Sequence, residues 1–287
     1  IGYVPNRAGV RLRTGRTNVI SLVMSTENEI MNMTARLTAS IANGLRGTPY
    51  HLNLTHFFPG DDPMVPIRYI VETGAADAVI FNAVQPDDPR VEYLVAKGFP
   101  FAMHGRSQLT ERQANFDYDN DAFAQLAVET LAARSRSNLL LIPPPINQFY
   151  SQEIVKGAKA ACSRNKIRLI IAEGVTSDST IDEVLGFTAS VLVSNPDIDG
   201  ILTAAPNAAM AATAGLEKVG RTIGQDIDLV AKDAITFLKL FRKEMIIIRE
   251  DVALAGEFLA KSAIHAIRSP LEPRMRYLDT PSRIFRS

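Results

Sequence analysis

The sequence lacks tryptophan, has one cysteine in 287 residues, and carries no excess charge of either sign. A single cysteine, Cys162, excludes an internal disulfide and predicts a protein of a reducing compartment, the cytoplasm. The spacing of Ala158, Ala161 and Cys162 is that of a buried helix face, which predicts a structural thiol and not a nucleophile. Because 31 basic residues balance 31 acidic ones, no global field marks a nucleic-acid partner, and any such signal must be local.

Long apolar runs and a signal-peptide pattern are also absent, so no membrane partner is expected. The four histidines show no metal-ligand spacing, and no Gly-x-Ser-x-Gly elbow occurs. The segment from Gly215 to Thr222 imitates a phosphate-binding loop, with Arg221 in place of lysine. Such a loop opens a helix, whereas Gly220 follows an expected helix at 208–219 and is predicted to end it. We therefore expect no catalytic residue, no cofactor and no metal, and hence no enzyme.

Short apolar segments alternate with helical periodicity along the chain. Strands are expected at 19–24, 50–58, 77–81, 99–103, 139–142, 169–172, 200–203, 228–231 and 245–248. Helices are expected at 33–45, 67–71, 91–95, 123–131, 154–161, 181–193, 208–219 and 252–267, followed by a proline-punctuated tail. This alternation predicts an α/β protein, and its restart after Asp117 predicts two Rossmann-like lobes with parallel sheets. The first lobe would comprise residues 18–115 and 250–287, and the second lobe residues 118–247.

Polar side chains follow the expected strands of the first lobe. Ser25 and Glu27 follow the first strand, Asn82 follows the third, and His104 and Arg106 follow the fourth. The carboxyl ends of parallel strands meet at one edge, so these side chains are expected in one cleft. Each alone would suit an ordinary capping or loop position. Their recurrence predicts a site for a ligand that is rich in hydroxyls or carries a charge. Arg106 has the bidentate donors for vicinal hydroxyls or a carboxylate.

The first residues form a local basic segment in front of the first strand. Arg7, Arg11, Arg13 and Arg16 occur there without any carboxylate, and the apolar run VISLVM follows directly. A short helix from Arg7 to Arg13 is expected, with Gly15 as its stop. The simpler alternative is a solvated basic tail.

The order Gly-Tyr-x-Pro-Asn, Leu-Arg-Thr-Gly-Arg-Thr-Asn and then an apolar strand resembles the LacI family of bacterial transcription repressors. The resemblance implies that residues 1–17 are the end of a DNA-binding headpiece and the hinge helix. The chain begins within this motif, so the headpiece itself is expected to be missing from it. The rest would be an effector-binding core of periplasmic-binding-protein type I architecture, with its ligand between the lobes. The implied partners are operator DNA, a small-molecule effector and a second copy of the chain in a homodimer.

The resemblance also assigns roles to residues. Ser25, Asn82 and Arg106 match family ligand contacts in the first lobe. Asp233 matches a strand-end aspartate of the second lobe, and Glu250 matches a polar residue near the crossover back to the first lobe. Three segments, His104-Gly-Arg106, Phe116-Asp-Tyr-Asp-Asn120 with Ala122-Phe-Ala124, and Val230-Ala-Lys232, are similar to the corresponding segments of members that sense carbohydrates. The resemblance therefore implies a sugar effector.

Two departures from the family pattern fall in the second lobe. Ile154 stands where an arginine is common, and Ala205-Pro206 stands where Asn-Asp is common. Either the ligand is less hydroxylated on that side, or Gln148, Phe149 and Lys232 hold it instead. Phe149 would equally suit the core or a dimer surface.

The implied DNA contacts lie in the basic segment. Leu12 matches a hinge leucine that wedges between base pairs in the minor groove. Arg11, Arg13 and Arg16 would contact phosphates. Leu12 would alternatively pack the hinge helix on its dimer mate.

Two rival functions remain open. A solute-binding protein of a sugar transporter would explain the cleft but not the basic segment. An α/β enzyme acting on a sugar or nucleotide would need an acid–base pair, for which Glu27 and Asp233 are the available carboxylates.

Overall fold

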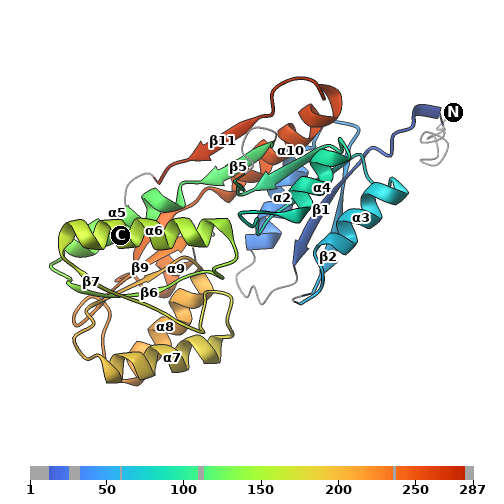
Figure 1. The fold of residues 1–287 in the computed structure, drawn as a ribbon. Coiled ribbons are helices and arrows are strands. Elements are labelled where there is room, and N and C mark those ends of the chain that lie inside the picture. Colours follow the sequence, from blue (N-terminus) through green and yellow to red (C-terminus); the bar gives the residue numbers. More distant parts are fainter. Residues whose placement is uncertain (1–12, 26–32, 59, 109–112, 235–236, 282–287) are drawn as a thin grey trace. The chain divides into compact units, whose positions relative to one another are not determined.

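The computed structural model describes residues 13–25, 33–58, 60–108, 113–234 and 237–281. The chain divides into two compact units, each with its own sheet (Figure 1). Unit 1 comprises Ile1–Glu27, Ala35–Asp117 and Ala253–Tyr277, and unit 2 comprises Asn28–Thr34, Tyr118–Val252 and Leu278–Ser287.

The sheet of unit 1 has the strand order β11-β5-β4-β3-β1-β2. Its strands are β1 (Val19–Ser25), β2 (His51–Phe57), β3 (Ala78–Phe81), β4 (Phe101–His104), β5 (Asn115–Tyr118) and β11 (Arg276–Asp279). Its helices are α2 (Met33–Gly44), α3 (Met64–Thr73), α4 (Pro89–Ala96) and α10 (Val252–Arg268). The pairings from β2 across to β5 are parallel.

Strand β1 pairs with β2 on one side and with β3 on the other, and its side chains from Ile20 to Met24 are buried. Val23 packs with Ile67 of α3 and Val91 of α4 in one buried cluster. Helix α4 begins at Asp88, whose side chain accepts a hydrogen bond from a backbone N–H of the first turn, and Pro89 occupies the first helical position. These are the residue types that start helices, so the local sequence sets where the β3–α4 loop ends.

The sheet of unit 2 has the strand order β10-β9-β8-β6-β7, and all its pairings are parallel. Its strands are β6 (Asn138–Ile142), β7 (Arg168–Ile171), β8 (Gly200–Thr203), β9 (Asp228–Asp233) and β10 (Ile246–Arg249). Its helices are α5 (Asn120–Ala132), α6 (Phe149–Asn165), α7 (Ile181–Ser194), α8 (Pro206–Lys218) and the short α9 (Leu238–Phe241).

Helices α5 and α6 cover one face of this sheet, and α7 and α8 cover the other (Figure 1). The approach of α6 to α5 requires a glycine at position 157, because a Cβ there would lie 2.4 Å from the carbonyl oxygen of Asp121. Each face has its own buried cluster, so the helix pairs are packed on the sheet separately.

Several sequence predictions are confirmed. The strands expected from residue 19 onwards and the helices expected from residue 33 onwards are present with shifted ends, whereas the helix expected from Arg7 to Arg13 lies outside the described residues except for its last residue. Gly220 lies just beyond the end of α8 with a positive φ of 77°, which confirms it as the glycine that ends the helix. Cys162 is buried, and burial raises the pKa of its thiol to about 11, as expected for a structural cysteine.

Two strands, β5 and β11, were not predicted. Strand β11 lies in the segment that was expected to be a proline-punctuated tail, and its four residues are exposed or half-buried. It is held by backbone pairing with β5, in which the N–H groups of Asn115 and Asp119 donate to the carbonyl oxygens of Met275 and Asp279. An edge strand held by backbone bonds needs no apolar alternation, so its sequence carries little signal. None of the helices in the described part of the chain is long and apolar enough to span a bilayer.

Candidate functional site

The carboxyl ends of β1, β3 and β4 bring four of the predicted effector contacts to one edge of the unit 1 sheet. Ser25 is the last residue of β1, and Asn82 directly follows β3. His104 is the last residue of β4, and Arg106 comes two residues later. The pairing register makes these three strands end nearly level with each other. Glu27 lies outside the described residues.

Buried hydroxyls at the strand ends are a feature of both units. The Oγ of Ser25 is buried and makes no hydrogen bond within the described residues. At the end of β8 in unit 2, Thr203 is fully buried, and its Oγ1 likewise has no hydrogen-bond partner in the described chain. A buried hydroxyl without a partner costs free energy, which a ligand hydroxyl would recover. The sequence analysis did not select Thr203 as a candidate effector contact. Its position at the end of a strand is nevertheless the same criterion by which Asn82 was selected.

The guanidinium of Arg106 is oriented by a carboxylate of the neighbouring strand. Its Nε lies 3.3 Å from Oδ2 of Asp117, which is buried in β5. The turn that precedes Arg106 is fixed, since the N–H of Gly105 donates to the carbonyl oxygen of Phe116 at 2.8 Å. The ring of His104 stacks on that of Phe116 with centroids 6.1 Å apart. The edge therefore presents an arginine whose charge is balanced and whose direction is set.

Two predicted contacts in unit 2, Lys232 and Glu250, bind each other. The Nζ of Lys232 lies 2.8 Å from Oε2 of Glu250 and donates to Oδ1 of Asn120 at 3.1 Å. Both charged side chains are buried. Three rings surround the ammonium group at 5.2, 5.9 and 5.4 Å: those of Tyr118, Phe123 and Tyr150. This arrangement ties β9 to β10, α5 and α6, and leaves a nearly neutral surface for a ligand.

The remaining predicted residues of unit 2 lie at helix and strand ends. Asp233 is the last residue of β9 and is buried, and Phe149 begins α6 and is half-buried. Ile154 is fully buried in the core cluster beneath α5 and α6, so the arginine that the family often has there is replaced by a core residue. Ala205 is the N-cap of α8 without a side-chain hydrogen bond, and Pro206 follows as the first helical residue.

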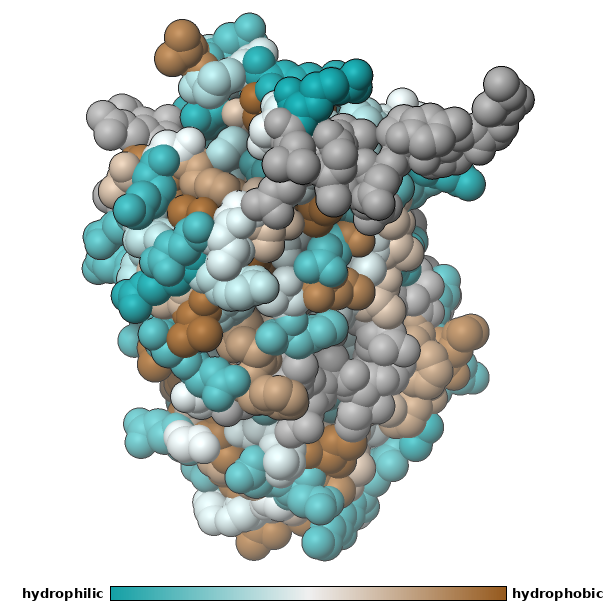
Figure 2. Space-filling model, turned by 90° about the vertical axis from the view of Figure 1, so that its right-hand side faces the viewer, coloured by the Kyte–Doolittle hydropathy of each residue, from teal (hydrophilic) through white to brown (hydrophobic). Residues whose placement is uncertain are grey.

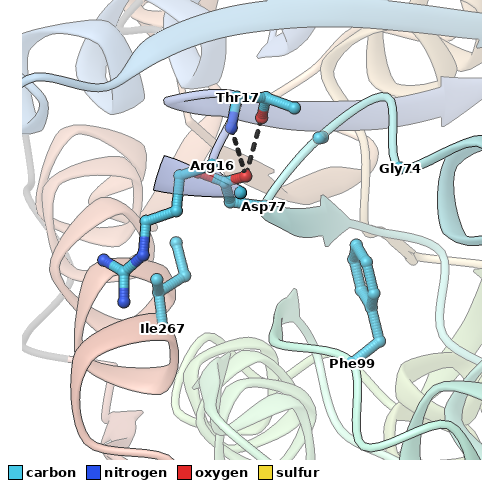
Figure 3. A pocket seen from close by; sticks show the side chains of 8 residues that line it. Arg16, Thr17, Gly74, Asp77, Phe99 and Ile267 are labelled. Carbon is cyan, nitrogen blue, oxygen red and sulfur yellow. Dashed lines mark hydrogen bonds between the residues drawn. The ribbon is translucent and has the colours of Figure 1, made fainter. Parts of the chain in front are cut away.

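The opposite, amino edge of the unit 1 sheet is closed by a carboxylate. Oδ1 of Asp77 accepts hydrogen bonds from the N–H and the hydroxyl of Thr17, both at 2.8 Å (Figure 3). Oδ2 accepts from the N–H of Asn18 at 2.9 Å. A pocket of about 320 Å³ lies beside this contact and is lined by Arg16 and Phe99, among others. This pocket is at the other end of β1 from the predicted effector contacts.

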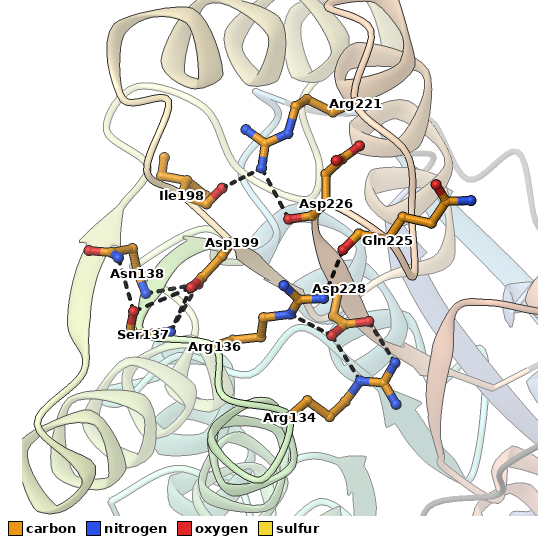
Figure 4. Close-up of polar contacts among 10 residues, drawn as sticks. All are labelled: Arg134, Arg136, Ser137, Asn138, Ile198, Asp199, Arg221, Gln225, Asp226 and Asp228. Carbon is orange, nitrogen blue, oxygen red and sulfur yellow. Dashed lines mark hydrogen bonds and ion pairs between the residues drawn. The ribbon is translucent and has the colours of Figure 1, made fainter.

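The amino edge of the unit 2 sheet is closed in the same manner (Figure 4). Fully buried Asp228 accepts from Nε of Arg134 at 2.8 Å and from Nε of Arg136 at 2.7 Å. Asp199 accepts from the backbone N–H groups of Ser137 and Asn138. Burial alone would raise the pKa of Asp228, but the hydrogen bonds and charges of the two arginines outweigh it and lower the pKa below its usual value.

The predicted DNA contacts are only partly within the described chain. Arg13 and Arg16 are exposed, and Gly15 between them has a positive φ of 68°, as expected where a helix stops. Arg11 and Leu12 lie outside the described residues. The described residues contain no group of three or more His, Cys, Asp or Glu side chains placed to hold a metal.

Comparison with known proteins adds to this geometry. The family profile described as periplasmic binding proteins and sugar binding domain of the LacI family matches residues 36–256. The regulator AglR of Rhizobium meliloti (strain 1021) is 28% identical over 274 residues, which is 93% of this chain and 76% of that protein.

Solved structures show the same fold. The complex of the regulator CelR with cellobiose has a TM-score of 0.80 at 21% identity, over 99% of this chain and 85% of that one. The lac repressor dimer bound to operator and an anti-inducer has a TM-score of 0.83 at 16% identity, over 98% and 97%. These likenesses confirm the predicted α/β fold of two lobes with parallel sheets. The relatives are transcriptional regulators, which confirms the expectation that the chain is not an enzyme.

Proposed function

Because this chain belongs to the LacI family, we propose that it is the effector-sensing part of a transcriptional repressor whose effector is a carbohydrate. The observation that carries this proposal is the pair of buried hydroxyls without partners, Ser25 Oγ and Thr203 Oγ1, at the carboxyl ends of the strands. A sugar hydroxyl can both donate and accept hydrogen bonds, and so can each of these two hydroxyls. In this proposal the strand ends of each unit contribute contacts to the effector.

The charge balance of the site favours a neutral sugar over a charged one. Arg106 is paired with Asp117, and Lys232 is paired with Glu250, so the charge of each of these two cations is balanced by a carboxylate and a phosphate or carboxylate ligand is not needed to balance it. The planar donors of Arg106 suit vicinal hydroxyls of a pyranose. Half-buried Phe149 would supply an apolar surface for a sugar ring. Its relative CelR is named in complex with cellobiose, which is consistent with a disaccharide.

A thermal-shift screen tests the ligand class. The chain would be heated with cellobiose, maltose, sugar phosphates, sugar acids and purines, because a ligand of the folded state raises the melting temperature. At a hundred times Kd the added stability is about 2.7 kcal/mol. We expect a neutral sugar to raise the melting temperature of the unchanged chain and to leave that of Arg106→Ala unchanged.

Arg168→Ala is the matched control. Arg168 is an exposed arginine of β7 that pairs with Asp197, away from the strand ends in question, so the rise should persist in this variant. A rise with purines but with no sugar would refute the carbohydrate proposal, and a sugar response that survives Arg106→Ala would refute the role of Arg106 in it.

We further propose that the residues in front of β1 bind operator DNA. Arg13 and Arg16 are exposed next to Thr17, which Asp77 fixes to the sheet. Each arginine that contacts a phosphate contributes a salt-dependent share of affinity. In a regulator that carries its DNA-reading headpiece, Arg16→Ala should reduce the slope of log affinity against log salt by about one. Leu12→Ala should weaken operator binding and leave sugar binding unchanged, and unchanged operator affinity would contradict the wedge role.

A homodimer is the third part of the proposal, because an operator with paired half-sites is read by a two-fold protein. Val65 and Tyr69 of α3 are four residues apart and each is 62% exposed. Figure 2 shows apolar side chains among hydrophilic ones on one side of the molecule. Sedimentation of Tyr69→Glu against the unchanged chain tests whether this helix contributes to association. A monomer with no salt-sensitive DNA affinity would favour the rival function of a sugar-transport component over a cytoplasmic repressor.

A further inference from the structure

A buried ion pair lies under the loop that carries Asn82. Arg90 is 3% exposed and Asp88 is 0% exposed, both in the first turn of α4. The Nη2 of Arg90 lies 2.6 Å from Oδ2 of Asp88, and its Nε lies 2.9 Å from Oδ1. Asp88 also accepts from the backbone N–H of Gln85 at 3.0 Å, so it fixes the middle of the β3–α4 loop.

The nitrogen that contacts Asp88 Oδ2 also reaches the strand end itself. Nη2 of Arg90 donates to the carbonyl oxygen of Asn82 at 3.2 Å and to that of Ala83 at 2.9 Å. Its guanidinium lies 4.5 Å from the ring centroid of Phe81, the last residue of β3. Ala83 has a positive φ of 52°, a conformation that a residue with a side chain rarely adopts. The bond from Arg90 thus holds a strained turn directly after Asn82.

The same loop supports the turn that leads to Arg106. Gly105 has a positive φ of 111°, and a Cβ there would lie 3.3 Å from Cγ2 of buried Val84. The backbone N–H of Gln108 donates to the carbonyl oxygen of Pro86 at 2.9 Å. One hydrogen bond, together with the closeness of Gly105 to Val84, therefore joins the loop after β3 to the loop after β4, and a shift of the first loop would move the second.

From these contacts we infer that Arg90 and Asp88 are positioning residues for the effector site, which hold Asn82 directly and Arg106 through the adjoining loop. This inference rests on the proposed function, in which Asn82 and Arg106 bind the effector. Neither residue of the pair touches the ligand. Their role is to keep the donors and acceptors of the strand ends in place before binding. This reduces the conformational entropy that is lost when the ligand binds.

Arginine is required at position 90 by the geometry of its donors. Its planar fork spans two carboxylate oxygens, two carbonyl oxygens and the face of an aromatic ring at once. Lysine would keep the positive charge but lacks the Nε that bonds Oδ1 of Asp88 and the planar group that lies over the ring of Phe81, so its single ammonium would not be held in the direction of the two carbonyl oxygens. Arg90→Lys therefore weakens the positioning contacts while preserving the charge.

The first test needs no ligand. Hydrogen–deuterium exchange of the free protein is compared between the unchanged chain, Arg90→Lys and Arg136→Lys, the last of which weakens a pair to a buried carboxylate in unit 2. We expect faster exchange in residues 82–86 and 105–108 in Arg90→Lys alone, with the amides of β1 unchanged. If Arg90→Lys does not fold, Asp88→Asn serves instead, because asparagine keeps the N-cap acceptor but loses the charge. Unchanged exchange in both loops would overturn the inference.

The second test separates positioning from stability. Titration calorimetry with cellobiose and maltose gives Kd for Asn82→Ala, Arg90→Lys and the double variant, well below their melting temperatures. We expect Arg90→Lys to raise Kd about tenfold in the unchanged chain and to have a much smaller effect in Asn82→Ala, because the two residues act through one contact. An equal effect in both backgrounds, or no effect on Kd, would contradict the role through Asn82. If neither sugar binds the unchanged chain, the proposed effector class fails, while the exchange experiment still decides the role of Arg90.

Discussion

The two edges of each sheet use similar polar residues in opposite ways. At the amino edges, the carboxylates of Asp77, Asp199 and Asp228 are hydrogen-bonded through both oxygens to neighbouring loops. At the carboxyl edges, the hydroxyls of Ser25 and Thr203 are buried without a hydrogen bond in the described chain. A carboxylate whose two oxygens are both bonded within the protein stabilises the fold and is poorly placed to bind a ligand. Groups held in place but unsatisfied are the ones that a ligand can satisfy.

The largest effect is expected at the amino edge of unit 2. Asp228→Ala leaves Arg134 and Arg136 facing a buried space without a counter-charge, which should lower the free energy of unfolding by about 3 kcal/mol, the lower end for a broken buried pair because both arginines are partly exposed. Urea unfolding at neutral pH measures this loss. Sugar affinity well below the melting temperature should not change. An equal loss of affinity would mean that the two edges are not independent.

A smaller effect is expected for Asp77→Ala at the amino edge of unit 1. The backbone N–H groups of Thr17 and Asn18 and the hydroxyl of Thr17 would lose their acceptor, at a cost of about 1–2 kcal/mol since water reaches this contact. In a regulator with its headpiece, operator affinity should fall while the sugar Kd stays constant. If the sugar Kd rises instead, Asp77 supports the effector site and not the basic segment.

Acid should weaken the amino edge of unit 2 through Asp228. Its pKa is lowered in the folded state from an ordinary 3.8, so the ionised form stabilises the fold. This contribution is fully present above the unfolded pKa and is lost as the pH falls through the lower folded value. Asp228→Asn should therefore lose less stability than the unchanged chain when urea unfolding is repeated at pH values from about 5 downwards. Parallel pH profiles for the two chains would argue against this assignment.

The smallest effect on stability is expected at the carboxyl edge. Thr203→Val removes a buried hydroxyl that has no partner in the described chain, so the free protein should be as stable or more stable, by up to about 1 kcal/mol. Its sugar Kd should nevertheless rise. Thr188→Val is the control, because buried Thr188 donates to the carbonyl oxygen of Val184 and its loss should not affect sugar binding. A destabilised Thr203→Val with unchanged sugar affinity would place Thr203 among ordinary core residues.

Local patterns in the sequence were sufficient for the architecture. The alternation of short apolar segments with helical periodicity predicted the two parallel sheets, because strands and helices bury their faces with different periods. Gly220 and Cys162 were likewise predicted from their immediate neighbours. Asn82, His104 and Arg106 could be assigned to one sheet edge because the ends of parallel strands are set by topology and not by distant contacts.

Tertiary structure alone decided which polar residues are already satisfied. Lys232 and Glu250 were predicted as effector contacts, yet they lie 2.8 Å apart in a cluster with Asn120, more than a hundred residues earlier in the chain. Strand β11 exists because β5 offers it a backbone edge. Arg90 is a plain helix residue in the sequence, and its role depends on where the turn at Ala83 places two carbonyl oxygens. Burial patterns can be predicted from residues that are neighbours in the sequence. Hydrogen-bond pairing depends on residues that meet only after the chain has folded.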